Sequence, residues 1–181
     1  MAVESTPVPL GTAAPSFTLR GTDGKMHSLQ ELRGERGTVI AFICNHCPYV
    51  QAVLPRMLDD ARTLLDHGVR FIAINPNDAR AYPEDSYDRM VEAARDWPLP
   101  YLHDEMQDVA RAYDAVCTPD FFGYDAQLHL RYRGRLDAGR KEPVEDAPRE
   151  LLDAMRRIAQ GRSPAEPQYP SLGCSIKWKE P

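Results

Sequence analysis

Continuous apolar runs and helically spaced apolar residues alternate through the middle of the chain. The runs 38–43 (TVIAFI) and 69–75 (VRFIAIN) are rich in β-branched residues and almost free of polar ones, which predicts two strands buried on both faces. The segment 47–67 between them has helix signals at both ends, because Pro48 fits a first helical turn and Gly68 suits the position after the last one. This order predicts a right-handed strand–helix–strand unit with parallel strands.

Shorter signals flank this unit on both sides. Asp23-Gly24 between two alternating runs predicts a β-hairpin, and Ser28 to Glu31 forms a capping box that opens a short helical turn. Downstream of a polar loop at 76–85, the pattern predicts helices at 86–97, 106–113 and 148–160, an extended piece at 101–102, and a hairpin of 120–124 with 127–132.

The composition suits one α/β domain. The chain has 181 residues, of which 43% are hydrophobic and 27% charged, enough to bury a sizeable core. We expect the domain to span residues 1–161, with a loose lead-in at 1–15. We expect the tail, 162–181, to pack on this domain with Trp178 as its anchor.

The charge pattern narrows the choice of partners. A formal net charge of −5 without any basic block argues against nucleic acid or an anionic membrane surface as a partner. The longest apolar run has only the length of a strand, so no transmembrane segment is predicted. The first ten residues lack the basic and apolar regions of a secretory signal, and we therefore expect a cytoplasmic protein.

The candidate chemistry lies where the first buried strand meets the long helix. Cys44-Asn45-His46-Cys47 places two cysteines there with two residues between them. Such a pair can close into a small disulfide ring, and a helix N-terminus favours a thiolate. In a reducing compartment a close pair is more often catalytic or metal-binding than structural, so this spacing predicts a redox centre.

The element order, the CxxC and Thr118-Pro119 before a hairpin strand together resemble the thioredoxin fold, over roughly residues 15–160. The segments FICNHCPYV, INPND, YPEDS, CTPDFF and GCSIKW resemble, more narrowly, the bacterial redoxin group described as thioredoxin-family or peroxiredoxin-like proteins. This resemblance implies a three-layer α/β fold with a central mixed sheet flanked by helices, an N-terminal hairpin and an extended C-terminal tail.

The resemblance also implies roles for the site residues. Cys44 would lie at an exposed lip as the nucleophile, and Cys47 would resolve the mixed disulfide. His46 would be partly cationic and lower the pKa of Cys44. Thr118 would offer its backbone to a substrate strand, beside a cis peptide bond to Pro119.

Two further cysteines and one missing acid set this chain apart from the simplest thioredoxin. Cys117 and Cys174 could act as auxiliary redox residues, and a folded-back tail could bring them together; Cys117 could equally be a small buried hydrophobe. The strand 38–43 carries no carboxylate like the buried acid of thioredoxin. A base would then come from the loop after the next strand, which also reads as an ordinary solvated acidic loop. The candidates are Asp78, Glu84 and Asp85.

Two other functions compete with a redox centre for the same residues. A peroxiredoxin needs PxxxTxxC, but Ala41 and Gly37 stand three and seven residues before Cys44, so direct peroxidase activity is disfavoured. A soft-metal (Zn or Cu) protein of the same fold is the alternative, although structural zinc sites usually have two short ligand pairs and this chain has one. Its ligands would be Cys44, His46, Cys47 and Cys117.

The sequence thus favours a thiol–disulfide oxidoreductase with a Cys44–Cys47 couple, serving antioxidant defence or protein-thiol maintenance. Its partners would be protein or small-molecule disulfides and thiols together with an external thiol reductant. No organic cofactor and no bound metal are expected, since the dithiol itself is the reagent.

Overall fold

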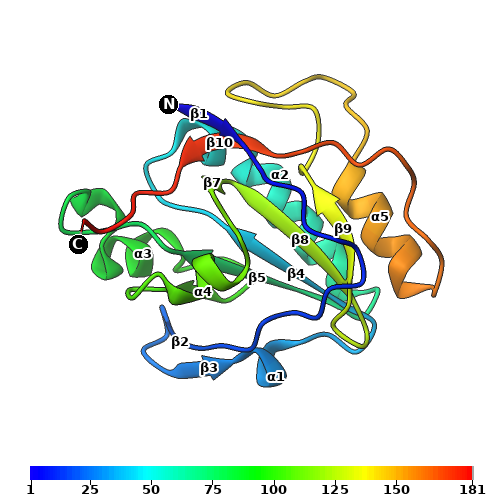
Figure 1. Ribbon diagram of the computed structural model, residues 1–181, viewed down its shortest axis with the longest axis horizontal. Coiled ribbons are helices and arrows are strands. Elements are labelled where there is room, and N and C mark those ends of the chain that lie inside the picture. The colour runs from blue at the N-terminus through cyan, green and yellow to red at the C-terminus, as the bar shows by residue number, and fades with distance from the viewer. Residues whose placement is uncertain (181) are drawn as a thin grey trace.

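A computed structural model describes residues 1–180 and shows a mixed seven-stranded sheet with the order β3-β2-β6-β5-β4-β8-β9 (Figure 1). In chain order the elements are β1 (Ala2–Glu4), β2 (Thr18–Gly21), β3 (Met26–Ser28), α1 (Leu29–Leu32), β4 (Gly37–Phe42), α2 (Pro48–Leu65), β5 (Val69–Asn75), η1 (Pro83–Asp85), α3 (Tyr87–Ala93), β6 (Tyr101–His103), α4 (Asp108–Ala112), β7 (Cys117–Thr118), β8 (Asp120–Asp125), β9 (Leu130–Gly134), α5 (Glu150–Ala159) and β10 (Leu172–Ser175).

The central strand β4 explains why the protein has three layers. It pairs in parallel with β5 and antiparallel with β8, and all six of its residues are buried. Because side chains alternate along a strand, Val39 and Ala41 join the core that includes buried residues of α2 and α5, whereas Ile40 and Phe42 join a second core on the other face. The expected three-layer α/β fold with its central mixed sheet is confirmed.

Local signals placed most elements correctly. The β2–β3 hairpin is present, and Ser28 and Glu31 form the expected reciprocal capping box at α1. Pro48 is the first residue of α2, and Gly68 follows the helix with a φ of +73° that suits glycine. The later helices are shorter than their apolar patterns suggested, and α3, for example, ends at Ala93 ahead of Pro98 and Pro100.

The two ends of the chain form a second, three-stranded sheet with the order β1-β10-β7. Val3 pairs with Gly173, and Cys174 pairs with Thr118; in Figure 1 the blue first strand runs beside the red last one. The first residues are therefore not the loose lead-in that was expected, because β1 supplies backbone partners for the free edge of β10.

The tail is anchored differently from the prediction. Ile176 is 3% exposed and joins the second core, while Trp178 is 38% exposed and lies under the guanidinium of Arg111, 4.4 Å from its ring centre. The shorter aliphatic side chain fits the core completely, so Ile176 is the anchor. Pro181, the last residue of the expected tail, lies outside the described residues.

Within residues 1–180, none of the helices has both the length and the apolar character needed to cross a membrane.

Candidate active site

The CxxC lies between the end of β4 and the start of α2, as the sequence predicted. Cys44 follows the strand, and Cys47 is the residue immediately before the first helical turn. Both are free thiols, and their exposed fractions are only 2% and 0%. The expectation that Cys44 sits at an exposed lip is therefore wrong, because Thr118 and the segment that carries Asp85 close over it.

Thr118 contacts both thiols. Its hydroxyl lies 3.4 Å from Cys44 Sγ, and its carbonyl oxygen accepts a hydrogen bond of 3.2 Å from Cys47 Sγ. The peptide bond to Pro119 is cis, as the resemblance implied. The backbone of Thr118 is nevertheless not free for a substrate strand, because Cys174 of β10 pairs with it. The chain's own tail therefore lies on the edge that was predicted to bind a substrate strand.

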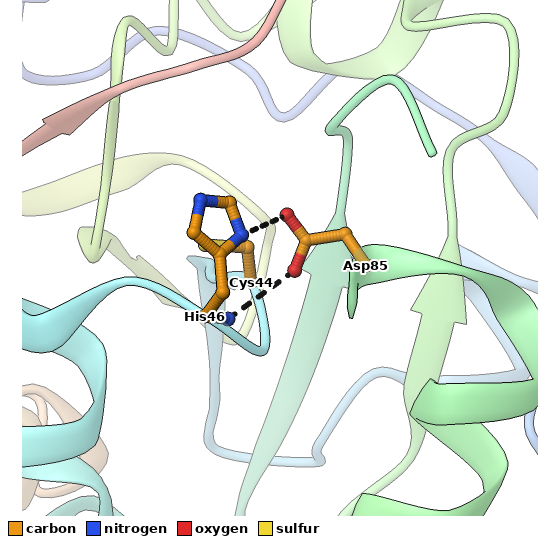
Figure 2. A group of neighbouring side chains, drawn as sticks. All are labelled: Cys44, His46 and Asp85. Atoms are coloured by element: carbon orange, nitrogen blue, oxygen red, sulfur yellow. Dashed lines mark hydrogen bonds and ion pairs between the residues drawn. The ribbon is translucent and has the colours of Figure 1, made fainter. Parts of the chain in front are cut away.

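A buried carboxylate, Asp85, organises the loop between the cysteines (Figure 2). Its Oδ2 lies 2.6 Å from His46 Nδ1, and its Oδ1 accepts hydrogen bonds from the backbone N–H groups of Asn45 (2.7 Å) and His46 (3.3 Å). The side chain of Asp85 is completely buried. A fixed carboxylate thus sets the orientation of the His46 imidazole.

Only one of the three acidic candidates in that loop reaches the site through its side chain. Asp78 pairs with the exposed Arg80 at 3.3 Å, and Glu84 contributes its backbone carbonyl to the Asn45 side chain at 2.9 Å. Asp85 is brought in by the short helix η1. The acid missing from β4 thus has a counterpart at the carboxyl end of the neighbouring parallel strand.

The residues that hold this carboxylate were not predicted from the sequence. Asn77 Nδ2 donates to Asp85 Oδ2 at 2.7 Å, and Asn75 Nδ2 donates to the Asp85 backbone oxygen at 3.2 Å. Tyr101 Oη donates to Asn45 Oδ1 at 2.9 Å. Asn75 and Asn77 could have been predicted as site residues from the sequence, because polar residues at the carboxyl end of a buried parallel strand commonly line a site at that sheet edge.

The electrostatics of the dithiol differ from the prediction. A hydrogen bond from the Cys44 thiol lowers the pKa of Cys47 to about 5 against the opposing effect of burial, and the Cys174 thiol contributes a further hydrogen bond in the same direction. The same bond to Cys47, burial and the negative charge of Asp85 raise the pKa of Cys44. The pKa of Cys47 is therefore the lower of the two, and His46 is not among the groups that shift the pKa of Cys44.

The auxiliary cysteines lie on different sides of the β7–β10 ladder. Cys174 is opposite Thr118, whereas Cys117 is opposite Ser175. Since side chains of successive residues point to opposite faces, the two thiols face away from each other, and the idea that they meet is not supported. Cys117 Sγ instead donates to the Pro119 carbonyl at 3.8 Å, and burial raises its pKa.

The metal alternative is not favoured by these contacts. Ligand atoms of Cys44, His46 and Asp85 lie within 4.8 Å of one another. However, the two Asp85 oxygens already take part in four hydrogen bonds, and an ion would have to break the one to His46 Nδ1. Cys117, which the alternative required, bonds to Pro119 instead.

A central mixed sheet, a dithiol at a strand–helix junction and a cis-proline beside it define a thioredoxin-fold protein of the redoxin type. Residues 10–133 match the AhpC/TSA family, and the chain belongs to that family. The match to the family ends at residue 133, so the α5 helix and the β10 tail lie outside the matched region.

Two solved structures are similar over nearly the whole chain. An uncharacterized conserved protein from Geobacillus kaustophilus is 46% identical, with a TM-score of 0.93 and coverage of 99% of this chain and 97% of that one. A hypothetical protein from Sinorhizobium meliloti 1021 is 36% identical, with a TM-score of 0.93 and coverage of 97% and 98%.

A more distant structure shares the fold. The thioredoxin domain of a thiol-disulfide oxidoreductase from Bacteroides vulgatus is 21% identical, with a TM-score of 0.56 and coverage of 71% of this chain and 91% of that one. The search of curated proteins found no match.

Proposed function

We propose that this protein is a thiol–disulfide oxidoreductase whose redox couple is Cys44 and Cys47. The observation that carries the proposal is the contact between two free thiols, one with a pKa lowered to about 5, at a strand–helix junction beside Thr118. A thiolate at neutral pH is the reactive form in disulfide exchange.

The electrons of the reaction balance with the two thiols, and water exchanges the protons. The Cys47 thiolate takes the proton of the Cys44 thiol while Cys44 Sγ bonds to one sulfur of a substrate disulfide, and the other substrate sulfur leaves as a thiolate that takes a proton from water. Cys47 then loses this proton to water and attacks Cys44 Sγ, and the second substrate sulfur leaves as a thiolate that takes a proton from water. The substrate disulfide is reduced by two electrons and the dithiol is oxidised. A Cys47 that is readily deprotonated is suited to this resolving step.

His46 and Asp85 are positioning residues in this proposal. Asp85 fixes both the imidazole and two backbone N–H groups of the CxxC loop, so that it controls the distance between the two sulfurs. The carboxylate also disfavours a negative charge on Cys44, which raises the free energy of that thiolate. We expect this pair to tune the reduction potential of the couple.

The proposed substrates are protein or small-molecule disulfides and thiols. An external thiol reductant in the cytoplasm would return the Cys44–Cys47 couple to its reduced form. Membership of the AhpC/TSA family supports redox chemistry in general. The name of the Bacteroides vulgatus neighbour, a thiol-disulfide oxidoreductase, is consistent with disulfide exchange. A role in antioxidant defence or protein-thiol maintenance would follow from such substrates.

The test is disulfide exchange by single-cysteine variants with insulin as the disulfide and dithiothreitol as the reductant. Cys44→Ser should reduce the rate to the uncatalysed background, and Cys47→Ser should accumulate a mixed disulfide through Cys44. Cys117→Ser is the matched control and should keep wild-type activity, because its thiol lies on the other face of β7. Full activity in both CxxC variants would refute the proposal.

A peroxide-consumption assay separates this function from a peroxidase. The PxxxTxxC motif is absent, so hydrogen peroxide should disappear no faster with the protein than with an equal concentration of free thiol. Rapid peroxide turnover that depends on Cys44 would instead favour a peroxidase.

A further inference from the structure

The C-terminal strand occupies the place that a substrate strand would need. β10 pairs antiparallel with β7, so that Cys174 stands opposite Thr118, the residue before the cis-proline. The fit is close, because a Cβ on Gly173 would collide with the Thr118 carbonyl. β10 therefore lies on this edge as an added strand, with a cysteine at the position facing the dithiol.

Cys174 is brought to Cys47 by this register. Cys47 Sγ donates to the Thr118 carbonyl at 3.2 Å, and Thr118 is the partner of Cys174 in the ladder. Cys174 also packs against the buried cluster that contains Cys47 and Cys44. The Cys47 sulfur thus has two thiol neighbours, Cys44 from its own loop and Cys174 from the tail.

The tail is held in place by hydrogen bonds that lead back to the site. Lys177 N donates to Asn77 Oδ1 at 2.9 Å, and the same Asn77 donates to Asp85 at 2.7 Å. The Lys177 carbonyl accepts from Asp78 N (2.9 Å) and from Gln107 Nε2 (2.8 Å). These hydrogen bonds dock the tail on the domain. Cys174 therefore stays near Cys47 at a high effective concentration, although no covalent bond joins them.

We propose that β10 is an internal substrate strand and that Cys174 exchanges with the Cys44–Cys47 disulfide to form a Cys47–Cys174 disulfide. This inference rests on the proposed function, which supplies the first disulfide. The Cys174 thiol loses its proton to water and attacks Cys47 Sγ. The Cys44–Cys47 bond breaks, and Cys44 leaves as a thiolate that takes a proton from water.

The exchange needs no further oxidant, because one disulfide is present before it and one after it. The resulting Cys47–Cys174 disulfide holds β10 covalently beside Thr118 at the β7 edge, and Cys44 is again a free thiol. The oxidised protein would then close that edge to an external strand while Cys44 remains able to react. Cys174 would be a third redox residue of the couple.

Peptide mapping can read this disulfide directly. Trypsin leaves Cys44 and Cys47 together on peptide 37–56, Cys117 on 112–131 and Cys174 on 163–177. The full chain is oxidised with oxidised dithiothreitol, quenched with acid, alkylated, digested and analysed by mass spectrometry. The proposal expects peptide 37–56 linked to 163–177 in the wild type, with a matching loss of alkylated 163–177.

Variants separate this inference from the proposed function. Cys44→Ser should convert almost all of the protein to the Cys47–Cys174 form, and Cys117→Ser should give the wild-type pattern. Cys174→Ser should still form Cys44–Cys47. If Cys174→Ser oxidises normally but Cys174 stays fully alkylated in wild type and in Cys44→Ser, the inference is overturned and the proposed function stands. If Cys174→Ser forms no disulfide, the proposed function fails.

Discussion

At the scale of single residues, the two thiols of the reduced site differ in the groups that surround their sulfur atoms. The Cys44 thiol, the Cys174 thiol and the backbone N–H of Val50 donate hydrogen bonds to Cys47 Sγ and lower its pKa. Cys44 has the carboxylate of Asp85 within 4.8 Å. Donors around one sulfur and a like charge near the other move the thiolate to Cys47.

This distribution predicts an unusual titration. The ultraviolet absorbance of the thiolate in the reduced protein should have a midpoint near pH 5, the pKa of Cys47, and the thiolate should persist at all higher pH. An ordinary cysteine titrates at about 8.5. Cys44→Ala should shift the midpoint upward, because it removes the first hydrogen-bond donor to Cys47, and Cys47→Ser should abolish the acidic transition.

Cys117→Ser is the control and should leave the midpoint where it is. A wild-type midpoint close to that of an ordinary cysteine would show that the hydrogen bonds to Cys47 do not outweigh its burial.

At the scale of elements, the junction of β4 and α2 presents the dithiol, and β10 covers it. α2 begins immediately after Cys47, so its position fixes the second sulfur. β10 is held between β1 and β7 and contacts the Thr118 backbone too closely for any side chain at position 173. The access of substrates to the site therefore depends on whether this short strand stays docked.

Gly173→Ala should undock β10. The added methyl group would meet the Thr118 carbonyl carbon and oxygen, which are backbone atoms that cannot move aside without shifting β7. Overpacking of this kind typically costs about 1–3 kcal/mol in unfolding free energy. We expect that loss in urea denaturation, together with faster alkylation of Cys174 in the native protein.

Ser163→Ala, at an exposed position of the same tail, is the matched control and should change neither quantity. Unchanged denaturation and unchanged Cys174 protection in Gly173→Ala would mean that β10 is not seated against Thr118 in solution.

At the scale of the whole molecule, buried charges connect the layers. Asp60 on α2 is completely buried and bonds to Arg149, the residue before α5, but its second oxygen has no hydrogen-bond partner in the described chain. Burial raises the pKa of Asp60 from 3.8 to about 6, despite the opposing effect of Arg149. The ionised carboxylate is therefore costly to keep in the folded protein at neutral pH.

The pKa of Asp60 gives a signed pH dependence. Because its folded-state pKa is raised, the stabilisation is fully present below pH 3.8 and is lost as the pH rises through about 6. Between about pH 5 and pH 8 this single group should lower the unfolding free energy by about 1.4 kcal/mol. Urea denaturation of Asp60→Asn should lack that component.

Glu92→Gln, which removes an exposed carboxylate on α3 that does not shift the pKa of Asp60, is the control and should retain the wild-type pH dependence. An identical pH dependence in wild type and Asp60→Asn would contradict the shifted pKa.

Most of the central fold could be predicted because its signals are local. The apolar run of β4, the Pro48 start of α2 and the capping box at Ser28 are each legible within a few residues. The ends of the chain could not be predicted in this way. β1 and β10 are short strands that pair with each other across almost the full length of the sequence, and neither has a strong strand pattern of its own.

The sequence alone determined that a dithiol stands at a strand–helix junction and that a proline lies two positions beyond Cys117, since both are properties of spacing. Only the tertiary structure decided which partners surround the dithiol. Asp85 meets His46 across 39 positions, and Cys174 meets Cys47 through a ladder to β7. Those contacts come from chain packing, and they lower the pKa of Cys47 and hold the tail over the site.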